Sequence, residues 1–233
     1  MRMSKTLLAL GVASALLVGC KKQDDSAAAD TATAAADANA TQTEAPAVET
    51  SPAATEAPAA KPAVVAFDID KIPVSDKPLP AWPYIALPAG YHYHEADDLA
   101  GQSKDLARVP VWTGGQLLWV EGKTFSDAIR SDDGKTYSKF EVRKNLQQAI
   151  EALGGVRIGE RSYDEATYKA NEKALDDFRQ EFDRIRDAYW YDADADTYVI
   201  RRADKAVWVV LQTGNGDGGI LVAEGPLPDA PAE

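Results

Sequence analysis

The pattern of apolar and polar positions divides the 233-residue chain into four parts. Residues 7–18 form an uncharged stretch made mostly of Leu, Ala, Val and Gly, whereas residues 21–63 are almost all Ala, Thr, Asp, Glu, Pro, Ser and Gln. Aromatic and β-branched residues begin abruptly at Val64 and continue to about Gly225, before a tail rich in proline and acid. Only the part from 64 to 225 has the composition of a chain that buries a core.

Two amphipathic helices are predicted in this part. Ser138-Lys-Phe-Glu141 has the spacing of a capping box, in which the Ser oxygen accepts from the amide of Glu141 and the Glu carboxylate returns to the amide of Ser138. Gly154-Gly155 ends the first helix. The second runs from Asp164 to about Ala188. The predicted core positions are Phe140, Val142, Leu146, Ala149, Ile150 and Leu153 in the first helix, and Tyr168, Leu175, Phe178, Phe182, Ile185 and Tyr189 in the second.

Short runs rich in Val, Ile, Tyr and Trp predict the strands. The first two predicted strands are joined by a Thr-Gly-Gly turn, and the last three form a meander. This order of elements predicts an α+β domain, in which an antiparallel or mixed sheet carries both helices packed on one face. The predicted strands are 109–112, 117–129, 156–158, 197–202, 206–212 and 220–224.

Residues 64–93 are dense in proline, which blocks helices and central strands, so we expect an extended strap there. Its aromatic residues, Trp82, Tyr84 and Tyr91, are expected to pin the strap across the domain. A proline-aromatic segment can instead serve as a peptide ligand for another protein if it is exposed.

The N-terminus combines a basic start, an apolar stretch and a cysteine. Arg2 and Lys5 precede the apolar stretch, which is too short to span a bilayer comfortably, and Leu17-Val18-Gly19-Cys20 resembles the lipobox of bacterial lipoprotein precursors. The resemblance implies cleavage before Cys20 and lipidation of that cysteine, which anchors the protein to a membrane through several acyl chains. The expected parts are a signal peptide (1–19), the lipidated Cys20 with a disordered linker (20–63), the domain (64–225) and a disordered tail (226–233).

Composition narrows the classes of partner. Cys20 is the only cysteine, so no intramolecular disulfide is possible. Removal of residues 1–19 takes away Arg2 and Lys5 and no acid, so the net charge moves from −12 to −14. Such an acidic chain repels phosphate backbones, and we therefore expect no nucleic-acid partner.

Two groups of residues suggest metal binding. His92 and His94 are two positions apart, so on a strand they would share a face and could bind zinc if a carboxylate completed the site. A pair of solvated histidines at the end of the strap is the alternative. Asp192, Asp194 and Asp196 have the spacing of calcium ligands but lack the Gly and Glu that complete a calcium loop.

No other catalytic pattern stands out. The chain has no Gly-x-Ser-x-Gly elbow and only one histidine cluster to supply a base, so we expect a non-catalytic protein without a cofactor. Trp112, Trp119 and Trp208 lie in predicted strands. They are expected either to pack in the core or, if exposed, to stack on sugars or peptides.

Three groups of short blocks cover most of 64–225. They are 72–79 with 83–84 and 87–91; 120–123 with Ser138-x-x-Glu-Val-x-x-Asn145 and 153–156; and 198–202 with 207–209. Together they resemble the uncharacterised domain that precedes the peptidoglycan-binding module in some envelope proteins of the outer-membrane protein A family. The resemblance implies a role in the cell envelope but transfers no catalytic residue. The peptidoglycan-binding module itself is missing after the last predicted strand, so direct peptidoglycan binding is not expected.

These observations favour a non-catalytic lipoprotein that engages another envelope protein. Because Lys21, and no aspartate, follows Cys20, resemblance to known sorting rules favours the outer membrane, with the domain facing the periplasm. The alternatives are a ligand-binding module for cell-wall glycan or peptide, and a metal-dependent hydrolase at His92 and His94.

Overall fold

The computed structural model describes residues 66–229. The predicted signal peptide, the lipobox residues Leu17, Val18, Gly19 and Cys20, and all of the predicted linker lie outside the described residues, as do 64–65 and 230–233. Within 66–229, none of the helices is both long enough and apolar enough to cross a bilayer.

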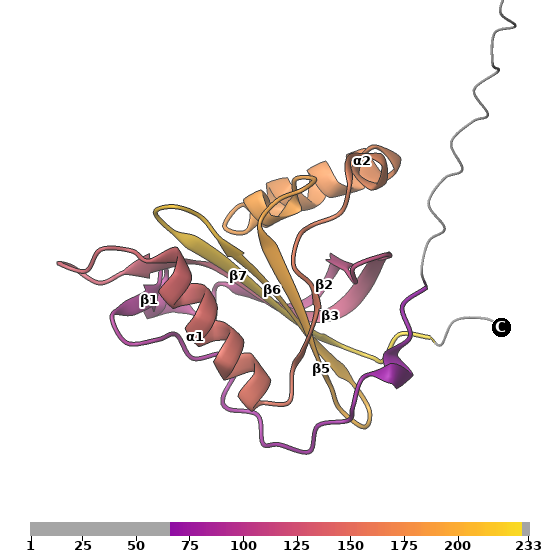
Figure 1. The fold of residues 1–233 in the computed structure, drawn as a ribbon, viewed down its shortest axis with the longest axis horizontal. Helices are drawn as coiled ribbons and strands as arrows, with labels where there is room; N and C mark the ends of the chain where they lie inside the picture. Colours follow the sequence, from indigo (N-terminus) through magenta and orange to yellow (C-terminus); the bar gives the residue numbers. More distant parts are fainter. Residues whose placement is uncertain (1–65, 230–233) are drawn as a thin grey trace, which may run out of the picture. The chain divides into compact units, whose positions relative to one another are not determined.

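The fold is α+β, as predicted, and is built on a seven-stranded antiparallel sheet (Figure 1). The strand order is β1-β3-β7-β6-β5-β4, and β2 pairs with β3 beside this path. Hairpin connections join β2 to β3, β5 to β6 and β6 to β7, as the predicted turns require. The strands are β1 (Tyr91–Tyr93), β2 (Ser103–Trp112), β3 (Leu117–Ser131), β4 (Val156–Gly159), β5 (Ala195–Arg201), β6 (Ala206–Thr213) and β7 (Gly218–Gly225).

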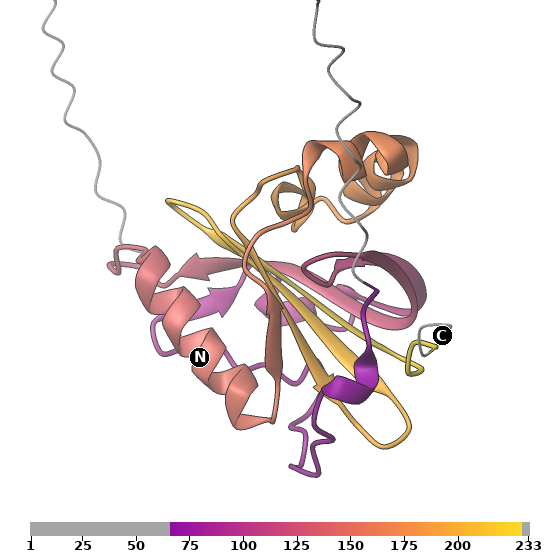
Figure 2. The ribbon, with the colours of Figure 1, turned by 45° about the vertical axis from the view of Figure 1, so that its right-hand side comes forward.

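The two helices, α1 (Lys139–Ala152) and α2 (Glu165–Glu181), lie on opposite faces of the sheet (Figures 1 and 2). Along β6, Trp208 belongs to the core cluster that includes α2, whereas Val207 and Val209 belong to the cluster that includes α1. The prediction that both helices pack on one face is therefore wrong. Strands β5 to β7 are apolar on both sides, and a sheet of that kind needs a cover on each face.

Helix α1 keeps half of the predicted capping box. The Ser138 hydroxyl oxygen accepts from the amide of Glu141 at 3.3 Å, but the Ser138 amide donates to the hydroxyl of Tyr91, which in turn donates to the Glu141 carboxylate at 2.9 Å. A tyrosine from β1 thus replaces the reciprocal bond and ties the helix to the sheet. Phe140, which we expected in the core, is 74% exposed, because the buried stripe runs through Val142, Leu146 and Ile150.

Helix α2 ends earlier than predicted. Asp164 caps its N-terminus, and the helix stops at Glu181, although the apolar spacing continues to Tyr189. The next two apolar residues, Phe182 and Ile185, lie in the turn after the helix, and their side chains are buried in the core. A short 3-10 helix (Arg186–Tyr189) then leads toward β5. Because apolar residues beyond Glu181 are also buried in the core, the apolar spacing continues past the end of the α-helix, and the predicted helix was too long.

The strap runs across the sheet largely without regular structure, as predicted. It contains one 3-10 turn (Ile69–Lys71), and a second (Ala96–Asp98) follows β1. The indole N–H of Trp82 donates to Ser103 at 2.9 Å, and the Tyr93 hydroxyl donates to the carbonyl of Ile85 at 2.7 Å. The Tyr84 hydroxyl donates to Glu224, and burial together with this carboxylate raises the pKa of Tyr84 to about 12. Aromatic hydroxyl and N–H groups thus fasten the strap to the domain.

We expect the two faces of the sheet to contribute comparable stability. Leu146 from α1 and Leu175 from α2 are both fully buried, so Leu146→Ala and Leu175→Ala should each lower the free energy of unfolding by about 2–5 kcal/mol in urea denaturation. Phe140→Ala is the control, and it should change stability by no more than about 0.5 kcal/mol. A large loss from Phe140→Ala would contradict the exposed orientation of that ring.

Candidate functional site

The two histidines do not assemble a metal site. Nδ1 of His92 lies 2.7 Å from Asp132, whereas Nε2 of His94 lies 3.5 Å from Glu95. Both rings are exposed, and each pairs with a different carboxylate. Among residues 66–229, no group of three or more His, Cys, Asp or Glu side chains is arranged to hold a metal ion. The geometry therefore gives the hydrolase hypothesis at this pair no support.

Two of the three aspartates with calcium-like spacing, Asp194 and Asp196, bind basic side chains through their carboxylates, whereas Asp192 accepts from Arg161 through its backbone carbonyl. Asp196 is buried, and Arg143 donates to both of its carboxylate oxygens, at 2.5 and 2.7 Å. Arg157 lies 3.7 Å from the same carboxylate. Asp194 pairs with Lys139 at 2.6 Å. These contacts connect α1 with β4, β5 and the segment before β5, so the acidic residues join elements of the fold.

The three tryptophans separate into two groups. Trp208 is fully buried and is excluded as a binding platform. Trp112 and Trp119, from the β2–β3 hairpin, are partly exposed and line an open groove of about 430 Å³ against α2. We call this hollow the tryptophan groove. It is lined by Trp112, Gly115, Gln116, Leu117, Trp119, Asp164, Ala166, Thr167, Ala170 and Asn171.

The groove exists because the first half of α2 presents small residues to the hairpin. Ala166 and Ala170 leave a space there, whereas Leu175 and Phe178 fill the core further along the helix. On the hairpin side, Gly114 has φ +86° in the turn between the strands, a conformation that favours glycine. A Cβ at Gly114 would also lie 2.6 Å from the carbonyl oxygen of Ile158, so a side chain there would shift the turn.

Three side chains on the groove wall keep hydrogen-bonding capacity. Oδ1 of Asp164 accepts from the Thr167 amide at 2.7 Å, the Asn171 amide group donates to the Thr167 carbonyl at 2.9 Å, and Oε1 of Gln116 accepts from Phe67 at 2.8 Å. Within the described part of the chain, no hydrogen bond engages Asn171 Oδ1 or Gln116 Nε2, and the Asp164 carboxylate, whose partners are the amide and the side chain of Thr167, has room to accept a further hydrogen bond. Hydrogen bonds from Thr167 lower the pKa of Asp164 below its ordinary 3.8, so this residue is a carboxylate at neutral pH.

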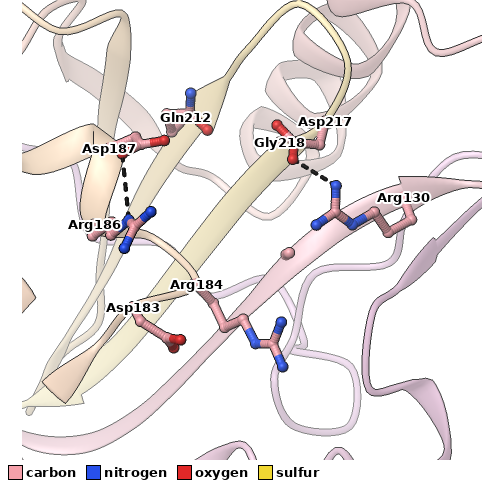
Figure 3. A pocket seen from close by; sticks show the side chains of 9 residues that line it. Arg130, Asp183, Arg184, Arg186, Asp187, Gln212, Asp217 and Gly218 are labelled. Carbon is pink, nitrogen blue, oxygen red and sulfur yellow. Dashed lines mark hydrogen bonds and ion pairs between the residues drawn. The ribbon is translucent and has the colours of Figure 1, made fainter. Parts of the chain in front are cut away.

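A second hollow, of about 240 Å³, is lined almost wholly by charged and polar groups (Figure 3). It lies between the end of α2 and the β6–β7 hairpin. Its three arginines are already paired: Arg130 with Asp217 at 2.5 Å, Arg186 with Asp187 at 3.7 Å, and Arg184 with Glu95 at 2.9 Å outside the view. The charges therefore balance within the protein, and the arginines offer an anion little attraction.

Sequence reasoning identified the aromatic floor of the groove but not its wall. Trp112 and Trp119 were candidates for stacking, whereas Gln116, Thr167 and Asn171 carried no expectation. The alanines of α2 were the available signal, since small residues on the side of a helix that faces a sheet leave room for a ligand.

No protein-family model matches the chain, and no curated protein is significantly similar to it. The resemblance to the domain found in outer-membrane protein A family members therefore stays a prediction.

The pairing of Asp196 predicts an asymmetric response to mutation. Arg143→Met leaves a buried carboxylate with only the more distant Arg157, and should lower the free energy of unfolding by about 3–5 kcal/mol. Asp196→Asn leaves two partly exposed guanidinium groups, which water can solvate, and should cost about 1.5–3 kcal/mol. Lys139→Met removes an exposed pair and, as the control in the same urea titration, should cost less than about 1 kcal/mol. Equal losses from all three variants would contradict this.

Proposed function

We propose that the protein is a lipid-anchored, non-catalytic binding module of the bacterial cell envelope, and that the tryptophan groove is its ligand site. The observation that carries this proposal is the groove itself. It is an open hollow with an aromatic floor and a few convergent polar groups, and its size falls within the range of small-ligand sites, roughly 300–1,000 Å³.

The lipid anchor is supported by the lipobox at Leu17 to Cys20 and by the basic residues before the apolar stretch. An anchor of this kind keeps the domain at a membrane surface while leaving the groove free to engage neighbouring envelope components. Resemblance to sorting rules, through Lys21, favours the outer membrane and a domain that faces the periplasm.

Of the two non-catalytic functions expected from the sequence, the groove favours ligand binding over a general protein contact. Trp112 and Trp119 converge on one concave site together with amide, hydroxyl and carboxylate groups. Outside the groove, the exposed Val74, Leu106 and Phe140 come from separate elements: the strap, β2 and α1. The adjacent Trp190 and Tyr191 are also exposed, but both rings pack against Tyr168, and Arg179 covers the ring of Trp190.

The anchor is tested by Cys20→Ser in the full chain. The variant should incorporate no alkyne-tagged fatty acid in growing cells and should accumulate at the mass of the uncleaved precursor, because both lipidation and cleavage need the thiol. Wild-type protein is the matched control. Equal labelling of the Cys20→Ser variant would refute the lipid anchor.

The ligand site is tested by a photocrosslinking residue placed at Asn171, which lines the groove, and separately at Lys144, which is exposed on α1. Irradiation of intact cells should give adducts from position 171 well above those from position 144. Ala170→Phe, which fills the groove from an exposed helical position, should remove them. Equal adduct yields at the two positions, or adducts that persist with Ala170→Phe, would show that the groove is not the binding site.

A further inference from the structure

The floor of the tryptophan groove is held in a fixed orientation. The Trp112 ring meets Tyr163 edge-on, with the centroids 6.2 Å apart and the planes at 81°. The guanidinium of Arg108 lies 4.9 Å from the centre of the Trp119 ring. Rings held in this way lose little conformational freedom when a ligand binds, which favours affinity. The Trp112 ring and the face of Trp119 opposite Arg108 suit a ligand that presents a flat array of C–H groups.

The wall of the groove suits a ligand that carries hydroxyl groups. The Asp164 carboxylate and Asn171 Oδ1 can accept hydrogen bonds, and Gln116 Nε2 can donate one. All three belong to side chains that are each fixed by another hydrogen bond, so their positions are set before a ligand arrives. A hydroxyl group both donates and accepts, and it can therefore satisfy either kind of partner.

The charge of the groove argues against an anionic ligand. The one charged residue in the lining of the groove is the carboxylate of Asp164. The nearby guanidinium of Arg108, over Trp119, lies 3.7 Å from the carboxylate of Glu121, which balances its charge. Asp164 also caps α2, so its charge offsets the positive end of the helix dipole. The chain as a whole is acidic as well. A neutral ligand fits this electrostatic setting best.

Binding of a peptide as an added strand is also disfavoured in the groove. The floor strands pair with each other there, with Pro110 opposite Trp119 and Trp112 opposite Leu117, and the edges that pair with no other described strand are the outer edges of the hairpin, along β2 and along 117–122 of β3. A peptide that lies on this face would meet side chains rather than the free backbone groups of a strand edge, which give strand addition its affinity.

We propose that the tryptophan groove binds a neutral pyranose ring of an oligosaccharide. The apolar face of the ring would stack on the indoles of Trp112 and Trp119, and its hydroxyls would bond to Asp164, Asn171 and Gln116. This proposal rests on the proposed function and names the ligand class of that same site.

The test is calorimetric titration of the purified mature lipoprotein in detergent with two neutral sugars, chitotriose and cellotriose, and with anionic trigalacturonate. We expect one or both neutral sugars to bind. Trp119→Ala should weaken this binding by about tenfold or more, and Ala170→Phe should abolish it.

Asp164→Asn keeps a good capping residue and should weaken binding without unfolding the domain. Phe140→Ala removes an exposed aromatic from the other face of the sheet and should leave binding unchanged. Circular dichroism confirms that each variant is folded.

Absence of binding by either neutral sugar to the wild-type protein would overturn the proposal, as would equal or tighter binding of trigalacturonate. Binding that survives Ala170→Phe would place the sugar elsewhere and would also overturn it. Failure of this inference is separable from failure of the proposed function. If crosslinking at Asn171 yields adducts with a protein while no sugar binds, the groove remains a ligand site but the sugar assignment falls.

Discussion

The structure depends on one constraint: strands β5, β6 and β7 are apolar on both of their faces. A sheet with one apolar face can leave the other in water, but this one cannot. The two helices are therefore divided between the faces, and the strap supplies further cover. On the side of α1 the helix packs along its length through a regular stripe of buried residues. On the side of α2 the first turns bury Tyr168 but present only Ala166 and Ala170 to the β2–β3 hairpin, so the cover stays incomplete there, and the tryptophan groove is the space that remains.

Much of the fold could be predicted from the sequence, because local signals and tertiary packing agree. Ser138 caps α1 and Gly154 follows its end, where the left-handed φ of +84° favours glycine. The boundaries of β3 to β7 are close to those expected from runs of Val, Ile and Tyr, but β2 begins six residues earlier than predicted, at Ser103, and β1 was not predicted as a strand. The choice of face for each helix was not predictable in the same way. Periodicity shows that a helix has an apolar side, but it does not show which side of a two-faced sheet that side will cover.

The candidate site was predictable only in part, for a related reason. A tryptophan in a strand looks the same in sequence whether it is buried, as Trp208 is, or lines a hollow, as Trp112 does. The difference lies in what packs above the ring, and for Trp112 and Trp119 that neighbour is more than 40 residues away along the chain. The aspartates gave the opposite error, a predicted site that does not form. Asp194 and Asp196 have the spacing of metal ligands, but each pairs with a basic side chain from a distant element.

The first described residues have a mechanical consequence. The backbone amide of Phe67 donates to Gln116, in the turn that borders the groove, and the ring of Phe67 packs on Trp208 at 5.7 Å between centroids. If the proposed lipid anchor holds the N-terminus, tension on the chain enters the described domain at this point. A pulling force would therefore reach the edge of the groove and the centre of the core before any other part of the domain, so the strength of the anchorage at Phe67 sets how much strain the ligand site experiences.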